Sequence, residues 1–209
     1  EANYKECEVK FDPADGYYYT GSYIIPNFTF YYRGRAYGTN SDPQGQFSFR
    51  VENNLNAGEA KLVLTMLGTN FIGTYEASFT IKPLPYSALN ISSDFTYDGT
   101  PKVPVFKIVQ GSEIDYTLRL GTDYELIGYK PRGSSADWST TAPTDAGNYD
   151  VQIRITTDNI DCRAGQVYNS VFEIKQCDIA GIGSIAIAPE WLVGENNEVN
   201  WSGGATEPD

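Results

Sequence analysis

The chain has 209 residues and a formal net charge of −12, and it contains no histidine. The lack of histidine excludes Ser-His-Asp and Cys-His nucleophile systems and zinc sites that need imidazole ligands. Sixteen tyrosines, ten phenylalanines, 20 glycines and 11 prolines predict an all-β protein with many turns. The negative charge is spread along the sequence, so we expect a surface that repels nucleic acid and anionic lipid, and no nucleic-acid partner. We also expect no membrane insertion, because no segment is apolar enough to span a membrane.

A turn and a strand near the start of the chain recur 78 residues later. The segments YYYTGSYIIP (17–26) and FTYDGTPKVP (95–104) each place a tyrosine two residues before a glycine and a proline five residues after that glycine. The segments that follow, NFTF (27–30) and VFKI (105–108), alternate apolar and polar residues in the same phase. This alternation is typical of a β-strand with one buried face.

The next strand recurs with one extra residue. QFSFRV (46–51) matches DYELIGY (123–129), and the additional residue near Gly128 predicts a β-bulge in the later strand. A long polar segment, KPRGSSADWSTTAPT (130–144), then occurs only in the second half and predicts an inserted loop.

The last two strands of the first half also recur. NAGEAKLVLTM (56–66) matches DAGNYDVQIRI (145–155) at a spacing of 89 residues, and YEASFTIKP (75–83) matches YNSVFEIKQ (168–176) at 93 residues. The insertions fall between the alternating runs, where surface loops tolerate them. The chain therefore contains two copies of one structural unit.

These matches predict two tandem immunoglobulin-like antiparallel β-sandwiches with about seven short strands each, unit one over 1–83 and unit two over 84–177. The prolines of KPLPYS (82–87) predict a short, stiff linker. Residues 178–209 predict a short C-terminal β segment, which is the start of a third unit, a cap, or a strand that pairs with a neighbour. The predicted core residues are Phe28, Phe30, Leu62, Leu64 and Phe79 in unit one and Phe106, Ile108, Val151, Ile153 and Phe172 in unit two.

The order of motifs in unit two resembles a bacterial family. YDG (97–99) is followed by a proline, GTDY (121–124), AGNYDV (146–151) and FEIK (172–175). This order is similar to the immunoglobulin-like surface repeats of the YDG or MBG type. Unit one carries YTG at the first position and GQFS (45–48) in place of GTDY.

The resemblance implies a fold and a setting rather than a ligand. Such repeats occur in tandem in large secreted and surface-anchored bacterial proteins, and similar ones are accessory modules of enzymes and parts of phage virions. The resemblance therefore implies an extracellular, cell-surface or secreted location and neighbouring repeats of the same chain as partners. No stretch is apolar enough to predict a signal peptide or a membrane span. We expect a mature product or, as the repeats favour, a piece of a longer protein.

Three functional hypotheses follow. The first is a non-catalytic stalk or spacer, part of an adhesin. The second is an adhesin module that binds a glycan or a host surface protein through the 130–144 loop, with Trp138, Arg132, Tyr18 and Tyr31 as candidate contacts. The third is a virion or filament protein that uses its C-terminal segment for assembly.

Two turn-like segments carry oxygen atoms that could bind a cation. DPADG (12–16) and NSDPQG (40–45) offer oxygen ligands for calcium, but Asp and Asn beside Pro or Gly are common turn residues, so we expect no cofactor, with calcium as the alternative. We also expect no enzyme, because small sandwiches rarely hold a deep pocket for a pair of catalytic carboxylates.

Cys7, Cys162 and Cys177 make an odd number of cysteines. We expect no Cys162–Cys177 disulfide and a fold that does not depend on disulfides.

Overall fold

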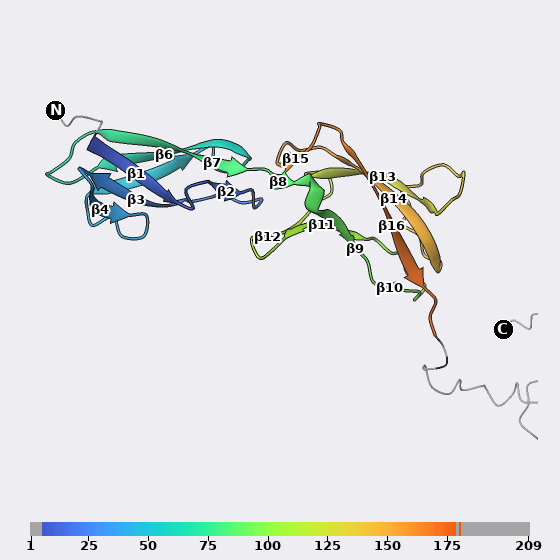
Figure 1. Ribbon diagram of the computed structural model, residues 1–209. Helices are drawn as coiled ribbons and strands as arrows, with labels where there is room; N and C mark the ends of the chain where they lie inside the picture. The colour runs from blue at the N-terminus through green and yellow to red at the C-terminus, as the bar shows by residue number, and fades with distance from the viewer. Residues whose placement is uncertain (1–5, 179, 181–209) are drawn as a thin grey trace, which may run out of the picture. The chain divides into compact units, whose positions relative to one another are not determined.

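The computed structural model describes residues 6–178 and 180, and β-strands make up most of it (Figure 1). We call residues 7–82 the first repeat and residues 84–175 the second repeat. The strands of the first repeat are β1 (Cys7–Asp12), β2 (Tyr17–Tyr18), β3 (Asn27–Tyr32), β4 (Arg35–Thr39), β5 (Phe47–Glu52), β6 (Gly58–Met66) and β7 (Thr74–Lys82). The elements of the second repeat are β8 (Leu84–Pro85), the 3-10 turn η2 (Tyr86–Ala88), β9 (Leu89–Ser92), β10 (Phe95–Thr96), β11 (Val105–Gln110), β12 (Ile114–Thr117), β13 (Tyr124–Pro131), β14 (Gly147–Ile155), β15 (Ile160–Asp161) and β16 (Val167–Lys175).

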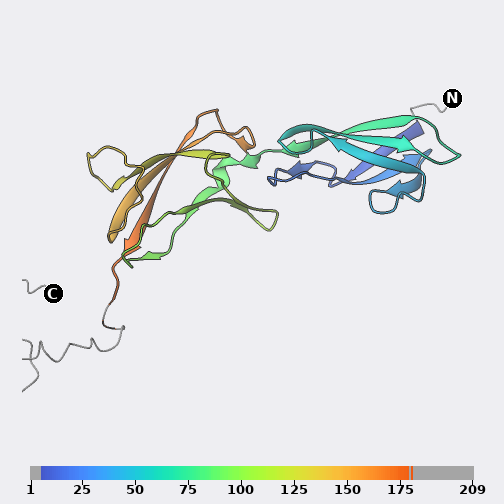
Figure 2. The ribbon, with the colours of Figure 1, turned by 180° about the vertical axis from the view of Figure 1, so that it is seen from behind.

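Both repeats use the same arrangement of sheets. The first repeat has a three-stranded sheet in the order β1-β3-β4 and a four-stranded sheet in the order β2-β7-β6-β5. The second repeat has the corresponding sheets β9-β11-β12 and β10-β16-β14-β13. In each repeat the short strand β2 or β10 runs parallel to the last strand, and the other pairs of these sheets are antiparallel. The predicted all-β sandwich fold is confirmed (Figure 2).

One connection differs from the order of an immunoglobulin constant domain. The strand β12 returns beside β11 as a hairpin, and β4 returns beside β3 in the same way. In an immunoglobulin constant domain, strands A and B lie in one sheet and the strand after B, strand C, joins the opposite sheet. The two-sheet layout is therefore immunoglobulin-like, while this hairpin is a feature of the present chain.

The strand registers recur at the spacing found in the sequence. Phe30 pairs with Gly38, and Ile108, 78 residues after Phe30, pairs with Tyr116. The pairing of β13 with β14 shifts between Leu126 and Gly128, as expected from the extra residue there. The bulge predicted from the sequence is therefore present.

The cores form where the alternation predicts them. All ten predicted core residues are buried, none more than 5% exposed. The first repeat has its own buried cluster of Phe28, Phe30, Phe47, Leu62 and Leu64. The larger cluster contains the core of the second repeat and continues into Tyr19, Ile24, Ala60, Phe79 and Ile81 of the first. The two cores thus share a buried contact.

The described residues up to Lys175 form one compact unit. Within the described residues, every strand pairing stays either inside 7–82 or inside 84–175. The predicted boundaries after 83 and after 177 stay predictions. Of the predicted C-terminal β segment 178–209, all but Asp178 and Ala180 lies outside the described residues. In the described part of the chain, no helix is long and apolar enough to cross a membrane.

Candidate functional site

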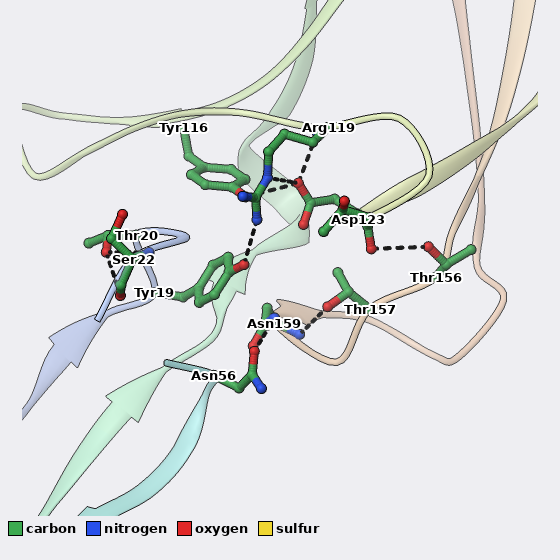
Figure 3. Close-up of polar contacts among 11 residues, drawn as sticks. Tyr19, Thr20, Ser22, Asn56, Tyr116, Arg119, Asp123, Thr156, Thr157 and Asn159 are labelled. Carbon is green, nitrogen blue, oxygen red and sulfur yellow. Dashed lines mark hydrogen bonds and ion pairs between the residues drawn. The ribbon is translucent and has the colours of Figure 1, made fainter. Parts of the chain in front are cut away.

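A polar cluster lies where the first repeat meets the connection between β12 and β13. Arg119 sits in this connection, and its Nη2 donates a hydrogen bond to the Tyr19 hydroxyl at 2.9 Å (Figure 3). The backbone N–H and Nε of Arg119 both donate to Oδ2 of Asp123, at 2.8 and 3.3 Å. Asp123 therefore orients Arg119, and Arg119 reaches the other repeat.

Asp123 is fully buried, and its charge is balanced locally. Its Oδ2 also accepts a hydrogen bond from the Tyr116 hydroxyl at 2.8 Å, while its Oδ1 has no hydrogen-bond partner among the described residues. Burial, with the Asp123 carboxylate, raises the pKa of Tyr116, so this phenol stays protonated and remains a donor. The hydrogen bond to Asp123 raises the pKa of Arg119 further above its usual value. The Tyr19 and Tyr116 rings complete the cluster, with centroids 5.5 Å apart.

A second polar contact joins the repeats through Asn159, which precedes β15. Its Oδ1 accepts the Ala57 N–H at 2.7 Å, and its Nδ2 donates to Oδ1 of Asn56 at 3.2 Å. Its backbone carbonyl accepts the Leu84 N–H at 2.8 Å, where β8 pairs with β15. Asn159 is only 8% exposed, and buried polar groups need partners. Its side-chain oxygen accepts from the first repeat and its backbone carbonyl accepts from the linker.

A cleft of about 520 Å³ opens beside the Arg119 cluster. Its walls come from the segment between β1 and β3, from the linker and from the hairpin that joins β11 to β12. The lining residues are Pro13, Asp15, Gly16, Tyr17, Tyr18, Tyr19, Thr20, Ile24, Lys82, Leu84, Glu113, Ile114, Asp115 and Tyr116.

Several side chains of the cleft already have partners within the protein. Lys82 lies over the Tyr18 ring at 4.3 Å and forms an ion pair with Asp15 at 3.0 Å. The Tyr17 hydroxyl accepts the Asn27 N–H at 2.8 Å and donates to a backbone carbonyl. The cleft is lined mainly by aromatic and aliphatic side chains, with Asp15, Glu113 and Asp115 at its acidic positions.

The four predicted contact residues lie on three segments, namely β2, β3 and the 130–144 loop. Tyr18 lines the cleft under Lys82, and Tyr31 on β3 has Lys10 over its ring at 5.1 Å. Trp138 is half-buried, with Lys130 over its ring at 4.8 Å, whereas the Arg132 side chain is exposed. In residues 6–178, no hydrogen bond, ion pair or ring contact joins these four residues to one another.

The predicted calcium segments show turn roles. In the second segment, Oδ1 of Asp42 accepts the Gln44 N–H at 3.2 Å. Over the described residues, no group of three or more His, Cys, Asp or Glu side chains is placed to hold a metal ion.

The three cysteines are free thiols in the structure. Burial raises the pKa of the Cys7 and Cys162 thiols, with a smaller contribution from nearby carboxylates. These two thiols therefore stay protonated and weakly nucleophilic near neutral pH.

Sequence reasoning missed Arg119 and Asn159, the residues that join the repeats. The available signal was the difference between GTDY (121–124) in the second repeat and GQFS (45–48) in the first. Only one of the two copies has a carboxylate at that position, which indicates a role that the other copy does not have.

No family model, curated protein or solved structure matches this chain. The resemblance to YDG or MBG-type surface repeats rests on the motif residues alone and stays a hypothesis.

Proposed function

We propose that this chain is a non-catalytic tandem segment that serves as a stalk or spacer in a bacterial cell-surface or secreted protein, part of an adhesin. The observation that supports this proposal is the contact between the repeats. Arg119 donates a hydrogen bond to the Tyr19 hydroxyl. Asn159 accepts a hydrogen bond from the Ala57 N–H and donates one to Asn56. A spacer needs such contacts, because an unrestrained linker lets successive domains reorient independently.

The linker between the repeats is also held in place. Leu84 is 1% exposed and pairs with Ile160 in a short parallel ladder, so the segment between the repeats is packed rather than free. These part-buried hydrogen bonds are directional, and leaving the buried side chains of Tyr19 and Asn159 without a partner is costly. These bonds therefore favour one relative orientation of the two repeats.

Residual dipolar couplings of backbone amides test the proposal. We expect the couplings of both repeats to fit a single alignment tensor in the parent protein. The double variant Arg119→Ala, Asn159→Ala should instead need two tensors, while each repeat keeps its chemical-shift pattern. Arg132→Ala is the matched control, because its side chain is exposed, and it should behave as the parent. Two independent tensors in the parent protein would refute the spacer proposal.

A second candidate is binding of a glycan or host surface protein through the 130–144 loop. The supporting observation is that residues 131–133 and 135–137 are exposed while Trp138 is held beside Lys130. A glycan-array screen of the parent protein beside Trp138→Ala separates this candidate from the spacer. The virion or filament hypothesis depends on residues 178–209, and truncation after Cys177 should abolish assembly only in that case.

A further inference from the structure

Tyr19 and Tyr97 occupy equivalent positions in the two repeats but differ in burial. The Tyr19 N–H bonds the Lys82 carbonyl at 2.9 Å, and the Tyr97 N–H bonds the Lys175 carbonyl at 2.8 Å. Tyr19 is 4% exposed, whereas Tyr97 is 41% exposed. The same backbone position is therefore covered in one repeat and open in the other.

The turns that follow the two tyrosines are equivalent as well. Gly21 and Gly99 have φ angles of 76° and 78°. In the first repeat the Ser22 N–H bonds Oγ1 of Thr20, and in the second the Thr100 N–H bonds Oδ1 of Asp98. The difference in burial does not arise from a different local fold.

The cover of Tyr19 comes from the second repeat. Arg119 bonds its hydroxyl, and Tyr116 packs against its ring. A Cβ atom added to Gly21 would lie 3.2 Å from Cε2 of Tyr116, whereas a Cβ atom added to Gly99 would meet no atom within 4 Å. The whole turn, and not only the tyrosine, is open in the second repeat.

The Asn159 contact has an open counterpart too. Asn56 and Ala57, which bond Asn159, correspond to Asp145 and Ala146, 89 residues later. Ala146 is exposed, while Ala57 is half-buried. In the described residues, no hydrogen bond is found for the Ala146 N–H.

In each repeat the last strand ends beside this tyrosine. The last strand of the first repeat, β7, ends at Lys82 beside Tyr19, and the next repeat begins there. The last strand of the second repeat, β16, ends at Lys175 beside Tyr97. A sandwich that followed Lys175 would thus start where the second repeat starts relative to the first.

We infer that the surface formed by Tyr97, Gly99, Asp145 and Ala146 is a docking site for a further repeat of the same kind. The counterpart of Arg119 in that repeat donates to the Tyr97 hydroxyl, and the counterpart of Asn159 accepts the Ala146 N–H. Asp145 replaces Asn56, which favours a donor from the occupant. The inference rests on the proposed function, since only an array presents successive repeats to one another.

Hydroxyl-radical footprinting of tyrosine side chains tests the inference. The protein of 209 residues is compared with an extended chain in which residues 84–177 are duplicated directly after Cys177. The added copy carries Tyr97→Phe, so that only the original Tyr97 is followed. We expect the reactivity of Tyr97 to fall about tenfold in the extended chain, the ratio of its 41% exposure to the 4% of Tyr19. Placing Arg119→Ala in the added copy should restore most of the reactivity.

Each outcome decides the question. Equal reactivity of Tyr97 in both chains overturns the inference, and so does a Tyr97 already protected in the chain of 209 residues, because another segment then covers the surface. Protection of Tyr124, which is 9% exposed, checks that both copies are folded. Tyr19 reports the existing contact in the same samples. A reactive Tyr19 refutes the contact behind the proposed function, whereas a protected Tyr19 with a reactive Tyr97 refutes only the further inference.

Discussion

The two repeats share their sheets and registers but differ at the residue before a buried aromatic side chain. Gln46 precedes Phe47 in the first repeat, and Asp123 precedes Tyr124 in the second. Both backbone N–H groups bond a carbonyl three or four residues earlier. Both side chains also hold one buried oxygen that has no hydrogen-bond partner in the described residues, Oε1 of Gln46 and Oδ1 of Asp123. The two residues therefore occupy equivalent positions, but Gln46 carries an amide and Asp123 carries a carboxyl group.

The surroundings explain why only the second repeat uses a carboxylate. Tyr116, which bonds Asp123, corresponds to Gly38 in the first repeat. A Cβ atom on Gly38 would lie 2.9 Å from the Pro43 carbonyl oxygen, so the first repeat has no room for a side chain there. The apolar positions maintain the shared sandwich, while polar substitutions at its end create the contact with the neighbouring repeat.

The largest expected effect tests whether each repeat has its own core. Phe172 is 4% exposed and lies within 6.0 Å, centroid to centroid, of the Phe95, Tyr129 and Tyr149 rings. Phe172→Asp places an unpaired charge among them, which should cost about 4 kcal/mol or more and unfold the second repeat. Amide resonances from the second repeat should then collapse to unfolded positions, while those around Phe30 persist.

Val171→Asp is the matched control for this prediction. Val171 is the preceding residue on β16 and is 45% exposed, so its replacement should leave the spectrum folded. An unchanged thermal unfolding curve for Phe172→Asp would show that the core assignment is wrong.

A smaller effect separates the two equivalent positions. Asp123→Ala removes the acceptor of three hydrogen bonds, from the Tyr116 hydroxyl and from the backbone N–H and Nε of Arg119, which should cost about 3 kcal/mol. Gln46→Ala removes one hydrogen bond, from Nε2 to the Gln44 carbonyl at 3.3 Å, and should cost about 1 kcal/mol. Urea denaturation of the two variants measures the difference. Equal losses of unfolding free energy would mean that the Asp123 carboxylate stabilises its repeat no more than the Gln46 amide stabilises the other.

The sequence predicted the strands and cores because a period of two residues determines which side chains face inward. Phe28, Phe30, Phe106 and Ile108 are buried as the alternation requires, and the insertion near Gly128 is a bulge. These features depend on neighbours in the chain or on an adjacent strand.

The contact between the repeats was not predicted, because it joins residues that no local pattern relates. Arg119 bonds a residue 100 positions earlier, and Asn159 bonds one 102 positions earlier. Such pairs depend on how the repeats are placed, which alternation does not encode. Trp138 was predicted as a ligand contact because it is a bulky side chain in a polar loop. It is half-buried with Lys130 over its ring, and its role as a contact stays a prediction.

The smallest expected effect concerns the turn that carries the YDG motif. Hydrogen bonds from Lys102, and then from Thr100, lower the pKa of Asp98 to about 2. The pKa of Asp98 is lower in the folded state than in the unfolded state, where it is about 4. The ionised Asp98 therefore stabilises the fold fully above pH 4, and this stabilisation is lost as the pH falls toward 2. Asp98→Thr copies Thr20 of the first repeat and removes this titration.

We therefore expect the parent to melt at a slightly higher temperature than Asp98→Thr at pH 7, and the two to converge near pH 2. Thermal unfolding between these pH values measures the gap, and it should remain small because Asp98 lies at the surface, where water screens the ion pair with Lys102. The reverse change, Thr20→Asp, should give a weaker pH dependence, since Ile24 stands where the second repeat has Lys102. A gap that stayed constant across the pH range would mean that Asp98 acts through the shape of the turn and not through its charge.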